Sequence, residues 1–202
     1  MTGLRCLTAL ATSALLSSAA HAAVVYNEAA SGDLSNSGAS PTFVAMASSA
    51  TNTVLGSTGN PGTGTDRDYF RFTVPAGQML TAITVAPGTV ALGAVSFIGL
   101  QAGAQVTAPV NGPATVLLGW THYAGSDIGN NILPTMGLGA GAIGFVGALG
   151  AGSYAIWIQD FGAGTAPYGF DFTLAPVPEA PAAPMLAAGL AALYGLRRRR
   201  VT

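Results

Sequence analysis

Short segments in which apolar and polar residues alternate recur along this chain, and glycine- and proline-rich turns separate them. Alternation with period 2 is typical of β-strands that bury one face. In residues 68–74, for example, Asp68, Phe70 and Phe72 lie on one side and Arg71 lies on the other. Because burying the charge of Arg71 would be unfavourable, we predict that the phenylalanine side faces the core.

The same pattern predicts strands in seven further segments. These are residues 42–47, 52–55, 79–85, 95–100, 115–120, 154–159 and 168–174. Turn-forming Pro-Gly and Asn-Gly pairs lie between several of them, and no helix is expected there. Half of the residues are apolar and only 7% are charged, which is unlike an intrinsically disordered chain. We therefore predict one all-β domain over residues 23–176, built as an antiparallel β-sandwich.

Residues 66–78 read Asp-Arg-Asp-Tyr-Phe-Arg-Phe-Thr-Val-Pro-Ala-Gly-Gln. This run is similar to the bacterial pre-peptidase C-terminal (PPC) domain, which has an Asp-x-Asp-Tyr/Trp-Phe strand followed by a Pro-Ala-Gly turn. Residues 28–35 resemble the start of that domain, and residues 154–158 and 168–172 resemble its closing hairpin. The resemblance covers residues 26–174. It implies a jelly-roll-like β-sandwich from a family without a shared catalytic activity.

The N-terminal segment, residues 1–22, has the features of a secretory signal peptide. A basic residue lies near its start, and residues 7–16 form an apolar centre that we expect to be helical. Small residues at Ala20 and Ala22 fit the signal peptidase, so we predict cleavage between Ala22 and Ala23. The alternative is a buried first helix. The prediction implies transfer across the inner membrane by the Sec export machinery.

The C-terminal segment, residues 177–202, has three parts in a fixed order. A proline-rich motif occupies residues 177–181, an apolar stretch occupies residues 182–196, and four arginines follow at once. The motif is Val177, Pro178, Glu179, Ala180 and Pro181, and the basic cluster is Arg197, Arg198, Arg199 and Arg200. This layout resembles the PEP-CTERM sorting signal, with alanine in place of the usual second proline. The resemblance implies recognition and cleavage by an exosortase-like membrane transpeptidase.

The residue types of this tail predict how it lies in the inner membrane. The prolines keep the motif extended, and the apolar stretch is expected to form a transmembrane helix, although it is shorter than the roughly 20 residues of a typical span. The arginines hold its end on the cytoplasmic side of the inner membrane. After cleavage the body would join the cell surface or the extracellular matrix. The alternative is a permanent membrane anchor that is never cut.

Charge and residue usage exclude several functions of the body. Residues 23–178 contain two arginines against seven carboxylates, a formal charge of −5, which disfavours nucleic acid as a partner. The single cysteine, Cys6, lies in the predicted signal peptide, so no disulfide is expected. His122 is the only histidine of the body, which excludes a zinc site built on several histidines.

No residue is predicted to be catalytic, and we expect a protein that is not an enzyme. His122, Ser126 and Asp127 have the residue types of a hydrolytic triad, but no Gly-x-Ser-x-Gly motif surrounds a serine. A divergent secreted hydrolase is kept as an alternative. The uncharged run 136–158 is long enough to span a membrane, but its repeated glycines favour a loop that leads into a strand.

Two candidate binding sites remain. Glu28, Asp66 and Asp68 offer oxygen ligands for calcium; alternatively, they accept hydrogen bonds from loop N–H groups. Tyr69 and Trp157 are predicted on outward strand faces, where aromatic rings stack on sugars. The body would then be a module that binds extracellular polysaccharide or another protein.

Overall fold

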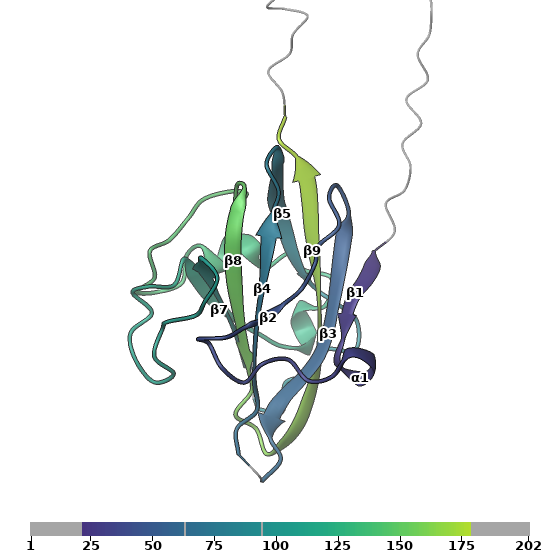
Figure 1. Ribbon diagram of the computed structural model, residues 1–202. Helices are drawn as coiled ribbons and strands as arrows, with labels where there is room; N and C mark the ends of the chain where they lie inside the picture. The colour runs from purple at the N-terminus through teal and green to yellow at the C-terminus, as the bar shows by residue number, and fades with distance from the viewer. Residues whose placement is uncertain (1–21, 63, 94, 179–202) are drawn as a thin grey trace, which may run out of the picture.

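The computed structural model of the protein describes residues 22–62, 64–93 and 95–178, which fold into two sheets packed face to face (Figure 1). The four-stranded sheet has the spatial order β1 (Ala23–Asn27), β3 (Thr51–Asn60), β9 (Gly164–Pro176), β5 (Gln78–Val85). The five-stranded sheet has the order β2 (Thr42–Phe43), β4 (Arg67–Val74), β8 (Gly152–Gln159), β6 (Ser96–Ala102), β7 (Gly119–Tyr123). Helical turns are α1 (Glu28–Ser31), η1 (Gly125–Asp127) and α2 (Leu133–Met136).

The core lies between the sheets and is formed by the apolar sides of the alternating strands. Phe70 and Phe72 on β4 are buried and face Phe172 on β9, with ring centroids 5.7 and 5.4 Å from that of Phe172. The predicted orientation of residues 68–74 is therefore confirmed. Aromatic pairs at these distances add to the stabilisation that burial of their area provides. The β-sandwich class is confirmed as well.

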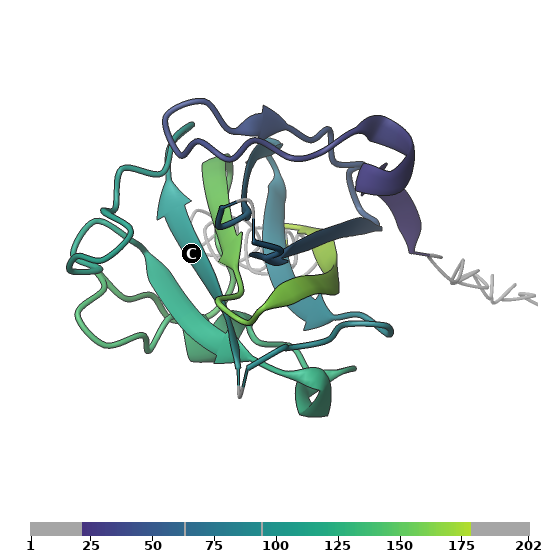
Figure 2. The same cartoon turned by 90° about the horizontal axis from the view of Figure 1, so that it is seen from below.

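The prediction of purely antiparallel sheets is wrong at two edges. β1 runs parallel to β3, and β2 runs parallel to β4, so both sheets are mixed. The reason is the long connection from β1 to β3, which crosses to the other sheet to form β2 before it returns. Figure 2, seen from below, shows this purple segment passing along one side of the sandwich. A parallel pair needs such a long crossover.

Strand positions otherwise follow the prediction, with three differences. β1 was not expected, β2 is only two residues long, and the strand predicted at residues 115–120 lies at β7, further along the chain. The uncharged run 136–158 begins at the last residue of α2 and contains a glycine-rich loop and most of β8, which confirms the loop interpretation. Among residues 22–62, 64–93 and 95–178, no helix has the length and apolarity that a membrane span requires.

The start of β1 and the end of β9 lie at the same end of the four-stranded sheet. Ala23 pairs with Asn52, and Asn52 pairs with Phe172, close to the last residues of β9. Both connections out of the sandwich therefore leave from one end. The predicted signal helix of residues 1–22 and the predicted tail helix of residues 182–196 lie outside the described residues, apart from Ala22.

Loops cover the outer face of the five-stranded sheet. The segment between β6 and β7 supplies Val106, Ala108 and Leu117, which pack on Tyr69 and Trp157 to form a second apolar cluster. Strand alternation alone predicts this sheet face as exposed, because it does not account for long connections. The sandwich thus has a partial third layer on this side.

Candidate metal centre

Three carboxylates from distant parts of the sequence meet at one side of the sandwich. Glu28 is the first residue of α1, Asp33 follows that helix, and Asp68 lies on β4. One carboxylate oxygen from each lies within 4.8 Å of those from the other two. The helical turn is fixed by Asn27, whose side chain accepts a hydrogen bond of 3.1 Å from the N–H of Ala29.

The chain turns sharply between the first two acids. Gly32 ends α1 with φ of 93°, a conformation that glycine adopts without the strain of a side chain. The carbonyl of Gly32 accepts a hydrogen bond of 2.9 Å from the hydroxyl of Tyr26. These contacts return Asp33 to the neighbourhood of Glu28, only five residues earlier in the sequence.

Glu28 is held in place by two backbone N–H groups. Its Oε1 accepts a hydrogen bond of 3.0 Å from Leu34, and its Oε2 accepts one of 2.7 Å from Ser57. Burial raises the pKa of Glu28 above the usual range for a glutamate, and these two hydrogen bonds oppose the change. The carboxylate is therefore oriented before any ligand arrives.

Asp68 is the buried member of the cluster, with 0% of its surface exposed. Its Oδ2 accepts a hydrogen bond of 2.6 Å from the hydroxyl of Tyr168, whereas its Oδ1 has no partner among the described residues. Burial, and next the charge of Glu28, raise the pKa of Asp68 to about 9. At neutral pH, Asp68 thus carries a proton unless a cation takes the proton's place.

The residues present fit a divalent cation. Hard cations such as Ca²⁺ prefer carboxylate oxygens, and the buried Oδ1 of Asp68 is a candidate ligand atom beside the other two carboxylates. Neither arginine of the described residues neutralises the negative charge of these carboxylates. Arg67 donates a hydrogen bond to Gln159, and Arg71 lies over the ring of Phe43. The cluster of Glu28, Asp33 and Asp68 is called the acidic cluster below.

The structure brings together two of the three residues that the sequence analysis proposes as calcium ligands. Glu28 and Asp68 come together, but Asp66 is not part of the acidic cluster. Asp66 lies before β4, where its backbone pairs with that of Gly59, and two residues along an extended chain displace it by roughly 6–7 Å. Asp33 was not predicted. The signal that points to it is the Ser-Gly turn between it and Glu28.

The candidate hydrolytic residues do not form a relay. His122 on β7 has its Nδ1 3.2 Å from the carbonyl oxygen of Ser96. The carboxylate of Asp127 accepts a hydrogen bond of 2.8 Å from the N–H of Ala124. In the described part of the chain, no hydrogen bond joins His122 to Ser126 or Asp127.

The predicted exposure of Tyr69 and Trp157 is wrong. Each has only 4% of its surface exposed, and their rings stack on one another with centroids 5.7 Å apart. Tyr69 is therefore not a stacking surface for sugars. Trp157 borders a hollow of about 440 Å³ that also contacts Phe97 and Trp120.

Of the predicted processing sites, only the residues nearest the sandwich are described. Ala22 precedes β1, and Ala23 is its first residue. Val177 donates a backbone hydrogen bond of 2.8 Å to Gly77, and Pro178 is the last described residue. The rest of the motif and the arginine cluster lie outside the described residues.

Comparisons of the chain with protein-family models, with curated proteins and with solved structures gave no match.

Proposed function

We propose that this chain is an exported, non-enzymatic protein of the bacterial cell surface or extracellular matrix. An exosortase-like membrane transpeptidase would recognise its C-terminal tail and cut near residues 178–181. The observation that carries the proposal is the order of the tail: proline-rich motif, apolar stretch, arginine cluster. The body is proposed to be a jelly-roll-like sandwich of the PPC type, and the tail helix is proposed to hold it briefly in the inner membrane.

The arrangement of the sandwich supports this topology. Both connections out of the body leave from one end of the four-stranded sheet, as the pairing of Ala23 with Asn52 and of Asn52 with Phe172 requires. A signal peptide and a tail that occupy the same membrane would meet the body from the same side. That end of the body would face the membrane. The sorting motif would lie between the body and the membrane, where a transpeptidase can reach it.

The proposal is tested by comparing the full chain with a chain that lacks residues 177–202, in cells that have the sorting enzyme. We expect the full chain at the cell surface or in the matrix, and the shortened chain in a different place or form. Replacing Arg197, Arg198, Arg199 and Arg200 by glutamine is the matched control, because it keeps the length and removes the charge. If the shortened chain reaches the same destination in the same form, the proposal is wrong.

A second proposal concerns the acidic cluster. We propose that Glu28, Asp33 and Asp68 bind Ca²⁺ and thereby stabilise the sandwich where the N-terminal segment joins β4. The buried, unpartnered Oδ1 of Asp68 supports it. Calorimetric titration of the full chain with CaCl₂ should show binding. Asp33→Asn should lower the affinity for Ca²⁺ at least tenfold, whereas Asp66→Asn should change it by less than twofold. Equal effects of the two variants, or no binding, would contradict it.

A further inference from the structure

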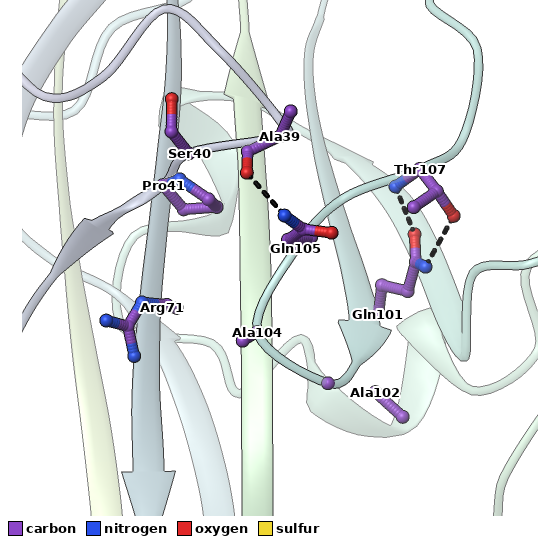
Figure 3. A pocket seen from close by; sticks show the side chains of 10 residues that line it. Ala39, Ser40, Pro41, Arg71, Gln101, Ala102, Ala104, Gln105 and Thr107 are labelled. Atoms are coloured by element: carbon purple, nitrogen blue, oxygen red, sulfur yellow. Dashed lines mark hydrogen bonds between the residues drawn. The ribbon is translucent and has the colours of Figure 1, made fainter.

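A polar hollow lies on the face of β4 that points away from the core. It has a volume of about 660 Å³, within the range of small-ligand sites. Figure 3 shows that three segments line it: the loop before β2, the strand β4 and the loop after β6. Its polar lining includes Ser40, Arg71, Gln101, Gln105 and Thr107. Among the residues that the structure describes, no carboxylate lines this hollow.

Arg71 is the charged group of the hollow. Its guanidinium carbon lies 5.0 Å from the centre of the Phe43 ring, and this cation–π contact holds the side chain against the sheet. No described residue accepts a hydrogen bond from the guanidinium or forms an ion pair with it. The other arginine of the body differs, because Nε of Arg67 donates a hydrogen bond of 3.1 Å to Gln159.

The polar wall opposite Arg71 is fixed by its own hydrogen bonds. Oε1 of Gln101 accepts from the N–H of Thr107 at 2.9 Å, and Nε2 of Gln101 donates to Oγ1 of Thr107 at 2.8 Å. Gln105 donates through Nε2 to the carbonyl of Ala39 at 2.6 Å (Figure 3). The Oε1 of Gln105 has no partner in the described part of the chain, so it is available to accept a hydrogen bond from a ligand.

We propose that this hollow binds an acidic sugar unit, a uronic acid within an extracellular polysaccharide. The planar guanidinium of Arg71 matches the two oxygens of a carboxylate. The amide oxygen of Gln105 and the hydroxyl of Ser40 suit sugar hydroxyls, which are both donors and acceptors. Phe43 is 53% exposed beside Arg71, so its ring can contact the apolar side of a neighbouring sugar.

The net charge of the body opposes an acidic ligand, and only the local charge of Arg71 favours it. The body is acidic overall, so a polyanion is repelled at long range, and a site for it needs a cation that internal carboxylates do not neutralise. Arg71 meets this requirement, because the carboxylates that the structure describes lie outside the lining of the hollow. A uronic acid in this hollow would give the body a polysaccharide-binding role that does not depend on the sorting tail.

The test is calorimetric titration of the full chain, kept in solution with a non-ionic detergent, with trigalacturonic acid. We expect binding that Arg71→Gln weakens about tenfold or more and that Arg71→Lys weakens less, because lysine keeps the charge and loses the bidentate geometry. Arg67→Gln is the matched control: it removes the same charge from the same face of β4 and should change affinity less than twofold. Phe43→Ala should weaken binding severalfold.

Further titrations test whether both the charge and the sugar ring of the ligand are recognised. Neutral maltotriose should not bind, and affinity for trigalacturonic acid should fall as NaCl rises from 20 to about 200 mM. Absence of binding, or equal loss in Arg67→Gln and Arg71→Gln, would overturn the proposal. Equal affinity for acetate would overturn its sugar component. A failure here leaves the sorting proposal intact, because that proposal is tested by the location of the protein. Unchanged urea midpoints of the variants confirm that they fold.

Discussion

The hydroxyl of Tyr168 donates a hydrogen bond of 2.6 Å to Oδ2 of Asp68, and both side chains are buried. Tyr168 lies on β9 of one sheet and Asp68 lies on β4 of the other, so this bond links the two sheets through the core. Such a polar link specifies how the sheets are aligned, because each group has few alternative partners. It also connects the core to the acidic cluster.

Tyr168→Phe should destabilise the fold. The substitution leaves the carboxyl of Asp68 buried without its donor, which typically costs about 1–3 kcal/mol. Urea unfolding at pH 6 measures the effect. Tyr154→Phe is the control: Tyr154 donates a hydrogen bond of 2.8 Å to the carbonyl of Gly150 near the surface, so its loss should cost less. Equal costs for the two variants would show that the Tyr168–Asp68 bond has no special role.

Without added cations, stability should fall as pH rises. The folded state raises the pKa of Asp68 to about 9, whereas an unfolded aspartate titrates near 4, so between these values the folded state binds the proton and the unfolded state releases it. The raised pKa of Glu28 acts in the same direction. We expect the urea midpoint in EDTA to decrease from pH 5 to pH 9. A midpoint that rises across this range would contradict the account.

The variant Asp68→Asn separates this effect from other titrations. It removes the group with the most strongly raised pKa in the acidic cluster, so the remaining slope of stability against pH should be much shallower. Addition of CaCl₂ to the natural chain should raise the midpoint at pH 8 far more than at pH 5, because the cation replaces a proton. The same addition should have little effect on Asp68→Asn.

The sequence predicts the strands well and the site only in part, for physical reasons. Alternation identifies β4, β8 and β9 because one face of each meets the core. It misplaces β7, because Leu117 lies in the loop between β6 and β7 and is buried by packing on the outer face of the sheet, not as part of a strand. It also misjudges Trp157, whose strand face is correct but whose exposure depends on the loop between β6 and β7. Parallel pairing at β1 and β2 joins distant segments that local patterns do not relate.

The acidic cluster illustrates the same limit. Glu28 and Asp68 stand out in the sequence because carboxylates are rare in this chain and these two lie in segments that resemble a known domain. Asp33 was missed because its position depends on the turn at Gly32 and on contacts with Tyr26. Asp66 lies outside the acidic cluster, since two residues of extended chain separate it from Asp68. Sequence spacing indicates the ligand type and does not establish which side chains converge.

Gly56→Ala should perturb the acidic cluster through close packing. A Cβ at Gly56 would lie 2.6 Å from Cζ of Tyr168 and 2.9 Å from the carboxyl carbon of Glu28, so both must move. We expect a cost of about 1–3 kcal/mol and weaker binding of Ca²⁺. Gly150→Ala is the control, because its Cβ would meet no atom within 4 Å. Equal Ca²⁺ affinity in both variants would contradict the placement of Glu28.

Trp157 should contribute through packing and not through its N–H group. Its Nε1 is buried without a hydrogen-bond partner among the described residues. Trp157→Ala should cost about 3–5 kcal/mol, and Trp157→Phe should cost at most about half as much, because it keeps an aromatic ring and removes an unpartnered donor. Urea unfolding of both variants measures this. A larger cost for phenylalanine than for alanine would show that the indole N–H is essential.

The central claim is that the chain is exported and that its tail is cut. The most direct test is the intact mass, with both terminal sequences, of the protein recovered from the surface or medium of cells that produce it. The account predicts a first residue of Ala23 and a last residue between Pro178 and Pro181. A protein that begins at Met1, or that still carries Arg197–Arg200, would contradict it.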